Sequence, residues 1–165
     1  MDLPDDAERV FAGPLHRARR RVEEANLLIL SDLPRGIDVA VQSVSENMAE
    51  LKKFIALNPS FRMALLPLDV QGSAPRAASM AASATSLAGV GPMAAIPGAL
   101  ADLAVERMQG IGCAVSLVED GGEISAMSDR PILVAIYAGR SPVSGRFGFL
   151  LERGDFPIGI ATSSA

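Results

Sequence analysis

The sequence has few of the side chains on which nucleophilic and metal catalysis usually depend. It contains one cysteine, Cys113, and one histidine, His16, in 165 residues. A single cysteine excludes an intrachain disulfide and a cysteine-ligated zinc site. Because the only histidine lies in an arginine-rich stretch near the N-terminus, no Ser-His-Asp or Cys-His arrangement is expected. Cys113 opens a predicted buried strand, where a small core residue is the simpler interpretation.

Aromatic residues are also scarce: the chain has no Trp, one Tyr and six Phe, while small apolar residues are plentiful. This composition favours closely packed helices and sites lined by backbone over an aromatic-lined pocket. The net charge is −4 and the pI is about 5.0, which argues against a nucleic-acid partner.

No stretch of the sequence combines the length and the large aliphatic residues of a membrane span. Residues 77–101 carry no charge, but they are mostly Ala, Ser and Gly and contain Pro92 and Pro97. Two buried helices that meet at a turn are therefore predicted, and no membrane partner. The acidic beginning, Met1–Asp6, lacks the apolar run of a signal peptide, so a cytoplasmic location is expected. We expect one domain over residues 1–165, with 1–14 as a flexible lead-in.

Hydrophobic periodicity predicts three main helices. The first spans residues 34–57, begins at a Ser31 cap and carries an apolar stripe at helical spacing: Ile37, Val41, Val44, Met48, Leu51 and Ile55. The second spans 75–88 and stops at Gly89. The third runs from Met93 or Pro97 to Met108. Residues 61–68 are expected to form an extended connection.

Strands dominate the remainder of the sequence. A first strand is predicted over 22–30, after an arginine-rich arm at 16–21 that is either a solvated edge or an anion-steering element. After Gly112 the apolar period becomes two, which predicts five short strands: 113–118, 123–127, 132–137, 147–151 and 158–162. Helices followed by neighbouring strands indicate an α+β fold, with the helices on one face of a largely antiparallel sheet.

Two glycine-rich stretches are the main candidate binding elements. Residues 89–102 form a glycine- and proline-punctuated turn that opens a helix, and the free N–H groups of such a turn suit phosphate or carboxylate. Residues 118–124 break a strand at a Gly-Gly pair, where backbone can approach a ligand closely. Tight helix–helix packing and a polar hairpin loop are the alternative interpretations. The candidate contacts are Gly89, Gly91, Met93, Gly98, Gly121, Gly122 and Glu123.

Two hydroxyl-bearing segments complete the candidate site. Ser144 and Arg146 lie on a loop that is a plausible anion clasp, and Thr162, Ser163 and Ser164 follow the last strand. Glu119 and Asp120 join Glu123 around the Gly-Gly pair, where carboxylates suit a cation or a ribose hydroxyl. The residues by themselves therefore predict an α+β domain that binds a small phosphate-bearing ligand, with no catalytic residue assigned.

The same segments resemble the ApbE-like superfamily of flavin transferases, which move FMN from FAD onto a protein threonine. The matching runs are residues 94–101, 118–124, 135–145 and 159–164, and the sequence is most similar to a small uncharacterised branch of that superfamily. The resemblance covers roughly residues 20–165. It implies an ApbE-like fold and binding of FAD or FMN with magnesium.

The sequence also departs from the pattern of the transferases. Asp102 and Leu103 stand where those enzymes have Lys-Gly, and Ala165 stands where a glycine is usual. The resemblance places the magnesium-binding pair and a histidine motif beyond residue 165, so no metal ligand is assigned and no flavin transfer is expected from these residues alone. The alternatives are a non-enzymatic accessory protein in sulfur assimilation toward homocysteine, and a structural oligomerising domain. An open strand edge at 158–165 further predicts a homodimer.

Overall fold

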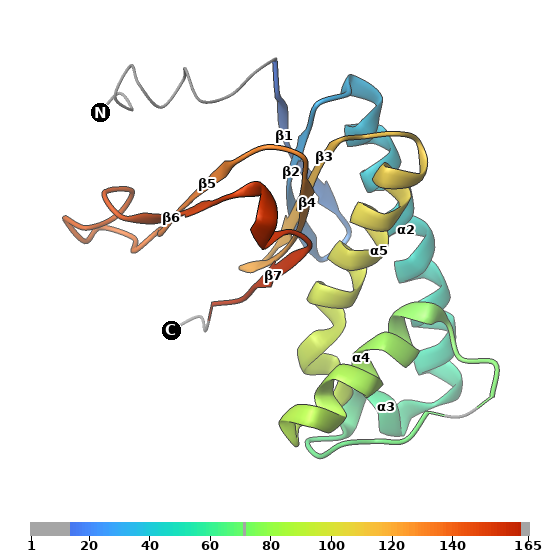
Figure 1. Ribbon diagram of the computed structural model, residues 1–165. Helices are drawn as coiled ribbons and strands as arrows, with labels where there is room; N and C mark the ends of the chain where they lie inside the picture. The colour runs from blue at the N-terminus through green and yellow to red at the C-terminus, as the bar shows by residue number, and fades with distance from the viewer. Residues whose placement is uncertain (1–13, 71, 163–165) are drawn as a thin grey trace.

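A five-stranded antiparallel sheet stands between a layer of helices and a projecting two-stranded arm (Figure 1). The computed structural model describes residues 14–70 and 72–162. The sheet order is β1-β2-β3-β4-β7. Its strands are β1 (His16–Val22), β2 (Ala25–Ser31), β3 (Val115–Asp120), β4 (Glu123–Ser128) and β7 (Ile158–Ile160). The predicted α+β class, with helices on one face of a largely antiparallel sheet, is confirmed.

The helices pack against one face of the sheet. They are α2 (Pro34–Leu57), α3 (Pro59–Met63), α4 (Arg76–Ala88), the 3-10 helix η1 (Pro92–Ala95) and α5 (Ile96–Gly110). Helices α2 and α5 lie next to the strands, and their apolar residues form one core with β2 and β3. The predicted helix over 34–57 is confirmed, and four residues of its stripe are buried: Ile37, Val44, Met48 and Leu51.

The start of α2 differs from the prediction. Ser31 Oγ accepts the N–H of Leu33 at 3.2 Å, and the residue at the N-cap position is Leu33 itself. The carboxylate of Asp32 reaches across to accept the N–H groups of Ala114 and Val115 at 3.2 and 3.0 Å. Asp32 therefore ties the end of β2 to the start of β3, and neither side chain caps the helix.

The extended connection predicted over 61–68 is wrong at its beginning. Residues 59–63 form α3, with Pro59 in its first turn and Phe61 fully buried. The ring of Phe61 meets that of Phe54 edge to face, with centroids 5.3 Å apart. Burial of this ring packs the short helix α3 back against the end of α2.

The arginine-rich arm is part of the sheet. Residues 16–22 form β1, which pairs in antiparallel register with β2 through a turn at Glu23 and Glu24. The predicted strand over 22–30 therefore divides into the end of one strand and most of the next. Strand β1 is an edge strand and its arginines are exposed, which agrees with a solvated edge.

The arm consists of β5 (Ile132–Ala135) and β6 (Gly148–Leu151), a separate two-stranded sheet. It projects away from the helices in Figure 1. Its base, at Ile132, joins a small cluster on the outer face of the main sheet with Val115, Leu117 and Ala126. The five strands predicted after residue 112 are thus all present with shifted ends, but they divide between two sheets.

Within the residues that the structure describes, no single helix is long and apolar enough to cross a membrane, while α4 and the η1–α5 segment pass that test only as a pair bent by 110°. The lead-in predicted for residues 1–14 lies almost wholly outside the described residues.

Candidate functional site

The turn between β3 and β4 meets the end of β7 at one corner of the sheet. We call Asp120, Gly121, Gly122, Glu123 and Thr162 the Gly-Gly corner. Gly121 and Gly122 have φ of 63° and 108°, the positive values that a two-residue hairpin turn requires. A Cβ added to Gly122 would lie 2.7 Å from Cγ2 of Thr162. The predicted close approach at the Gly-Gly pair is therefore made by another part of the chain.

The three carboxylates around this turn do not point the same way. Asp120 and Glu123 are register partners and lie on the face of the sheet toward the helices, whereas strand alternation places Glu119 on the opposite face. Among the residues that the structure describes, no group of three or more His, Cys, Asp and Glu side chains could hold a metal ion. The carboxylate cluster suggested by the sequence is thus split by the pleat of the strand.

Asp120 is the most perturbed carboxyl of the corner. Its side chain is buried, and Oδ1 accepts the backbone N–H of Asn26 at 3.1 Å. Burial disfavours the charged form and raises the pKa of Asp120, while the hydrogen bond from Asn26 opposes that shift. The Asp120–Asn26 bond also links the Gly-Gly corner to the start of β2.

The other glycine stretch lies away from this corner, at the end of the helical layer beyond the sheet (Figure 1). Gly89 ends α4 in the left-handed conformation, as predicted. A Cβ on Gly91 would lie 1.9 Å from the carbonyl oxygen of Ala64, so this glycine serves chain packing. Met93 packs partly buried against the core. Gly98 lies in the first turn of α5, where an added Cβ meets no described atom within 4 Å.

The loop of the β5–β6 arm holds the predicted anion clasp. Ser144 Oγ accepts the backbone N–H of Ala138 at 3.0 Å, which shapes the loop. Arg146 is exposed on the same loop. The arm carries both residues away from the Gly-Gly corner in Figure 1, so the structure does not bring them to it. Ser163 and Ser164 lie outside the described residues.

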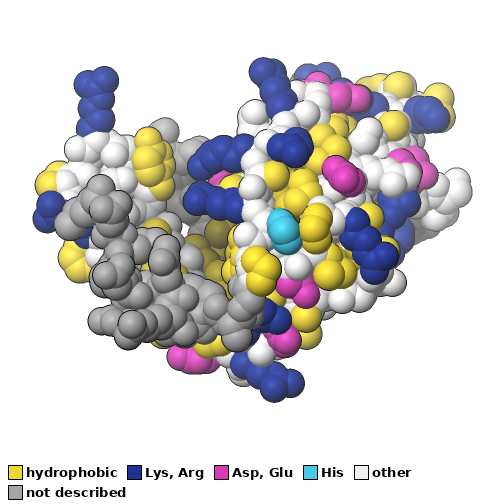
Figure 2. Space-filling view, turned by 90° about the horizontal axis from the view of Figure 1, so that it is seen from above, with side chains coloured by type: hydrophobic (Ala, Val, Ile, Leu, Met, Phe, Trp, Pro, Cys, Tyr) yellow, Lys and Arg dark blue, Asp and Glu magenta, His cyan; other side chains and the backbone are white. Residues whose placement is uncertain are grey.

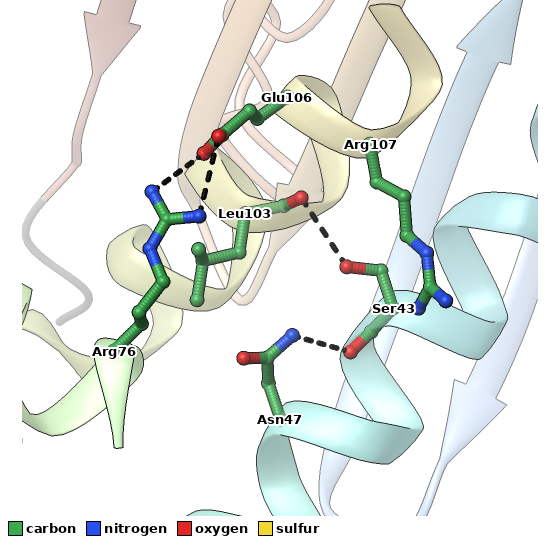
Figure 3. Close-up of a pocket in the computed structure, with 6 residues that line it drawn as sticks. All are labelled: Ser43, Asn47, Arg76, Leu103, Glu106 and Arg107. Carbon is green, nitrogen blue, oxygen red and sulfur yellow. Dashed lines mark hydrogen bonds and ion pairs between the residues drawn. The ribbon is translucent and has the colours of Figure 1, made fainter. Parts of the chain in front are cut away.

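Two cavities of about 300 Å³ each open elsewhere on the molecule, and neither was predicted as such. The first lies between α2, α4 and α5 (Figure 3). In it, Arg76 and Glu106 form a two-pronged ion pair at 3.2 and 2.8 Å. Ser43 Oγ donates to the carbonyl of Leu103 at 3.2 Å. Because these polar groups already satisfy one another, the first cavity offers a ligand few free contacts.

The second cavity is lined by Arg19, Arg20, Arg21, Asn26 and Leu27. Arg20 donates to the backbone carbonyl of Arg19, and Arg21 donates to that of Glu23. The cavity adjoins the Gly-Gly corner through Asn26, whose N–H bonds to Asp120. Seen from above, Lys and Arg side chains (dark blue) lie at several places on the surface, with apolar side chains (yellow) between them (Figure 2). The run of arginines was the sequence signal for this cavity, and strand pairing with β2 decided its place.

The chain is thus an α+β domain with a Gly-Gly turn at one corner of its sheet and an arginine-rich edge strand. Comparisons with known proteins show its family. A protein-family model described as "AbpE bacteria" matches residues 9–165, so the chain belongs to that family. Similar curated proteins are named "UPF0280 protein". The one from Methanocella arvoryzae is 36% identical over 148 residues, which is 90% of this chain and 60% of that protein.

Further relatives with the same name show the same partial coverage. The protein from Methanoculleus marisnigri is 44% identical over 137 residues, 83% of this chain and 56% of the relative. The protein from Methanosarcina acetivorans is 33% identical over 165 residues, 98% of this chain and 65% of the relative. The chain thus spans less than two thirds of the length of these curated relatives.

Proposed function

We propose that the Gly-Gly corner, with the arginine cavity beside it, binds a small phosphate-bearing molecule of the flavin-nucleotide class, FAD or FMN. The observation that carries the proposal is the packing of Gly122 against Thr162. It joins two sequence motifs that lie 40 positions apart, both of which had been assigned to the same ligand from the sequence.

The chemistry of the neighbouring groups supports this proposal. A turn with two positive-φ residues leaves backbone N–H groups available to an anion, and the hydroxyl of Thr162 adds a polar group at the same corner. Arg19 and Arg21 carry guanidinium groups, which bind phosphate oxygens in pairs. The bond between Asn26 and Asp120 places the arginine cavity next to the corner. Charge and backbone donors for a diphosphate are therefore available along one end of the sheet.

The proposal concerns binding and leaves flavin transfer aside. FAD brings a negatively charged diphosphate, and magnesium is usually bound jointly by such phosphates and a few oxygen ligands. Asp120 and Glu123 are the carboxylates of this corner that share a face. Magnesium is therefore expected to strengthen the binding of FAD and to have little effect on riboflavin, which lacks phosphate.

Titration with FAD, FMN and riboflavin, followed by flavin fluorescence with and without magnesium, tests the proposal. We expect micromolar affinity for FAD, about −8 kcal/mol. The variant Thr162→Val keeps the shape of the side chain and removes its hydroxyl, and it is expected to weaken FAD binding several-fold. Ser144→Ala, on the arm, is the matched control and should leave affinity unchanged. Absence of binding by all three flavins would overturn the proposal.

A second variant tests the part played by the arginines. Arg21→Gln keeps a long polar side chain without its charge, so it should weaken FAD and FMN but not any residual binding of riboflavin. Arg62→Gln, an exposed arginine on α3, is the control for the loss of one positive charge. Equal effects of the two variants would show that only the net charge of the protein matters.

A second candidate function is supported by a different feature. The exposed apolar residues of β5 and β6 favour a protein that works as part of a larger assembly, which is what the accessory-protein alternative requires. Mass measurement of complexes pulled down with the chain tests this candidate.

A further inference from the structure

The β5–β6 arm exposes an unusual amount of apolar surface for its size. Tyr137 is 87% exposed, Phe147 63% and Phe149 57%. These three rings alone present on the order of 400 Å² to solvent, taking the usual surface of such side chains. That matches the largest apolar patch of a typical monomeric protein, before the aliphatic residues of the arm are added.

The exposed residues occupy both faces of the arm. Register partners lie on one face, so Phe149, opposite Val134, continues the face that Ile132 and Leu151 begin at the buried base. Leu133 and Leu150 are partners on the other face, and they are 39% and 54% exposed. A ribbon with one wet and one packed face would alternate polar and apolar residues, and this one does not.

The arm is also short of strands. Its sheet has two strands, β5 and β6, within the described residues. An isolated two-stranded ribbon is marginally stable in water, and each of its outer edges presents unpaired backbone N–H and C=O groups. An added strand would supply both the missing hydrogen bonds and a cover for the rings.

The greater length of the relatives suggests which polypeptide could cover the arm. The protein from Methanosarcina acetivorans matches 98% of this chain with only 65% of its own length. About a third of that relative therefore has no counterpart among these 165 residues. We propose that the arm is the docking surface for such additional polypeptide, which adds at least one β-strand to β5 or β6 and covers the apolar rings.

A second copy of this chain fits the arm less well. Two identical arms that stack face to face use the same patch on both subunits, and therefore cover one face of each ribbon. The opposite apolar face would remain in water. A further polypeptide segment can pair along an edge and cross over both faces.

Co-expression tests the proposal directly. The chain, carrying an affinity tag, is produced together with the part of the Methanocella arvoryzae relative that has no counterpart in it. We expect a one-to-one complex in which the amides of 132–136 and 147–151 exchange with deuterium at least tenfold more slowly than in the chain alone. A chain that stays alone, or a homodimer in which the same amides are protected, overturns the proposal.

Two variants distinguish specific docking on the arm from non-specific hydrophobic association. Phe149→Ser removes one exposed ring from the arm and should weaken the complex at least tenfold. Leu87→Ser removes a side chain that is 93% exposed on α4, away from the arm, and should change nothing. Equal effects of the two variants would contradict the proposal.

The intact relative from Methanocella arvoryzae allows a measurement that does not combine polypeptides from two different proteins. In the intact Methanocella arvoryzae protein, the segments that align with β5 and β6 should be protected from deuterium exchange as strongly as those that align with β3 and β4. Rapid exchange confined to the arm segments in that intact protein would overturn the proposal.

Discussion

The two faces of the main sheet differ in how completely they are covered. The face toward α2 and α5 belongs to one continuous core that extends from Val22 to Val118 and includes Phe61. The opposite face carries a small cluster around Val115 and Ile132, and the chain leaves it to form the exposed arm. The comparison shows that the helical side of the sheet is covered within the described residues, while β5 and β6 on the other side keep apolar side chains exposed.

Charged residues follow a related division. In the helical half, cations meet acids across elements: Lys52 pairs with Glu23 and Glu24, and Arg76 with Glu106. The pairing with Lys52 lowers the pKa of Glu24. Two of the arginines that line the second cavity, Arg20 and Arg21, donate to backbone carbonyls, and the charge of Arg21 also contributes to the lowered pKa of Glu24. The proposed ligand site includes these arginines because guanidinium groups bind phosphate oxygens.

The largest expected effect compares two phenylalanines, one from each side. Phe61→Ala removes a fully buried ring and its edge-to-face contact with Phe54, and should cost about 3–5 kcal/mol of unfolding free energy. Phe149→Ala, on the arm, should change it by less than about 0.5 kcal/mol because the ring is mostly exposed. Urea unfolding curves measure both. A similar loss of unfolding free energy from the two variants would show that the two sides of the sheet do not differ in this way.

Two glycines of the predicted ligand turn provide the next test. Gly91→Ala drives a Cβ against the carbonyl of Ala64 and should destabilise the protein by about 1–3 kcal/mol. Gly98→Ala meets open space inside a helix and should stabilise it by about 0.5–1 kcal/mol. Thermal unfolding distinguishes them. If Gly98→Ala instead abolished FAD binding, the start of α5 would belong to the ligand site.

Asp120 predicts a pH dependence on the helical side. Burial raises its pKa above the ordinary value of 3.8, so the folded state holds the proton more tightly than the unfolded state. This contribution to stability is complete below pH 3.8 and is lost as the pH rises through the folded pKa. Asp120→Asn, which stays neutral, should therefore raise the melting temperature at pH 7.

The same experiment carries its own check. The advantage of Asp120→Asn should shrink as the pH is lowered from 7 toward 4, because the native carboxyl then becomes protonated too. Asp102→Asn, on the exposed face of α5, controls for the removal of one negative charge. An advantage that stays constant with pH would show that burial of the charge is not its cause.

The smallest expected effect concerns the ion pair of the first cavity. Arg76→Gln breaks the pair with Glu106, but both side chains are exposed, so the loss should not exceed about 0.5 kcal/mol. Most of that loss should disappear in about 1 M salt, which screens exposed charges. Thermal unfolding at two salt concentrations measures it. A loss above about 2 kcal/mol would show that this pair belongs to the core.

The sequence predicted the helices better than the ligand-site geometry. The stripe from Ile37 to Ile55 predicted α2 because a helical period over many residues averages out local exceptions. The turn at Gly121 was equally clear from its two glycines. By contrast, α3 was missed because it is only five residues long, too short for a helical period of apolar residues to appear.

The residues of the candidate site could be predicted from the sequence only in part. Gly122 and Thr162 were each recognised in the sequence, and the structure places them in contact. Gly91 was assigned to a ligand but packs against Ala64, because a glycine needed for close approach looks the same whichever group approaches it. Ser144 and Arg146 were separated from the corner by the arm, whose departure from the main sheet has no signal in the strand periodicity.

By itself, the sequence determined the α+β class, the long helix α2, the glycine turns and the number of strands after Gly112. Those features depend on local spacing of apolar residues and on the φ angles that glycine permits. Only the tertiary structure decided that the arginines of β1 pair with β2, that Gly122 faces Thr162, and that β5 and β6 leave the main sheet. Each of these depends on which distant segments find one another, and strand pairing is fixed by contacts over the whole chain.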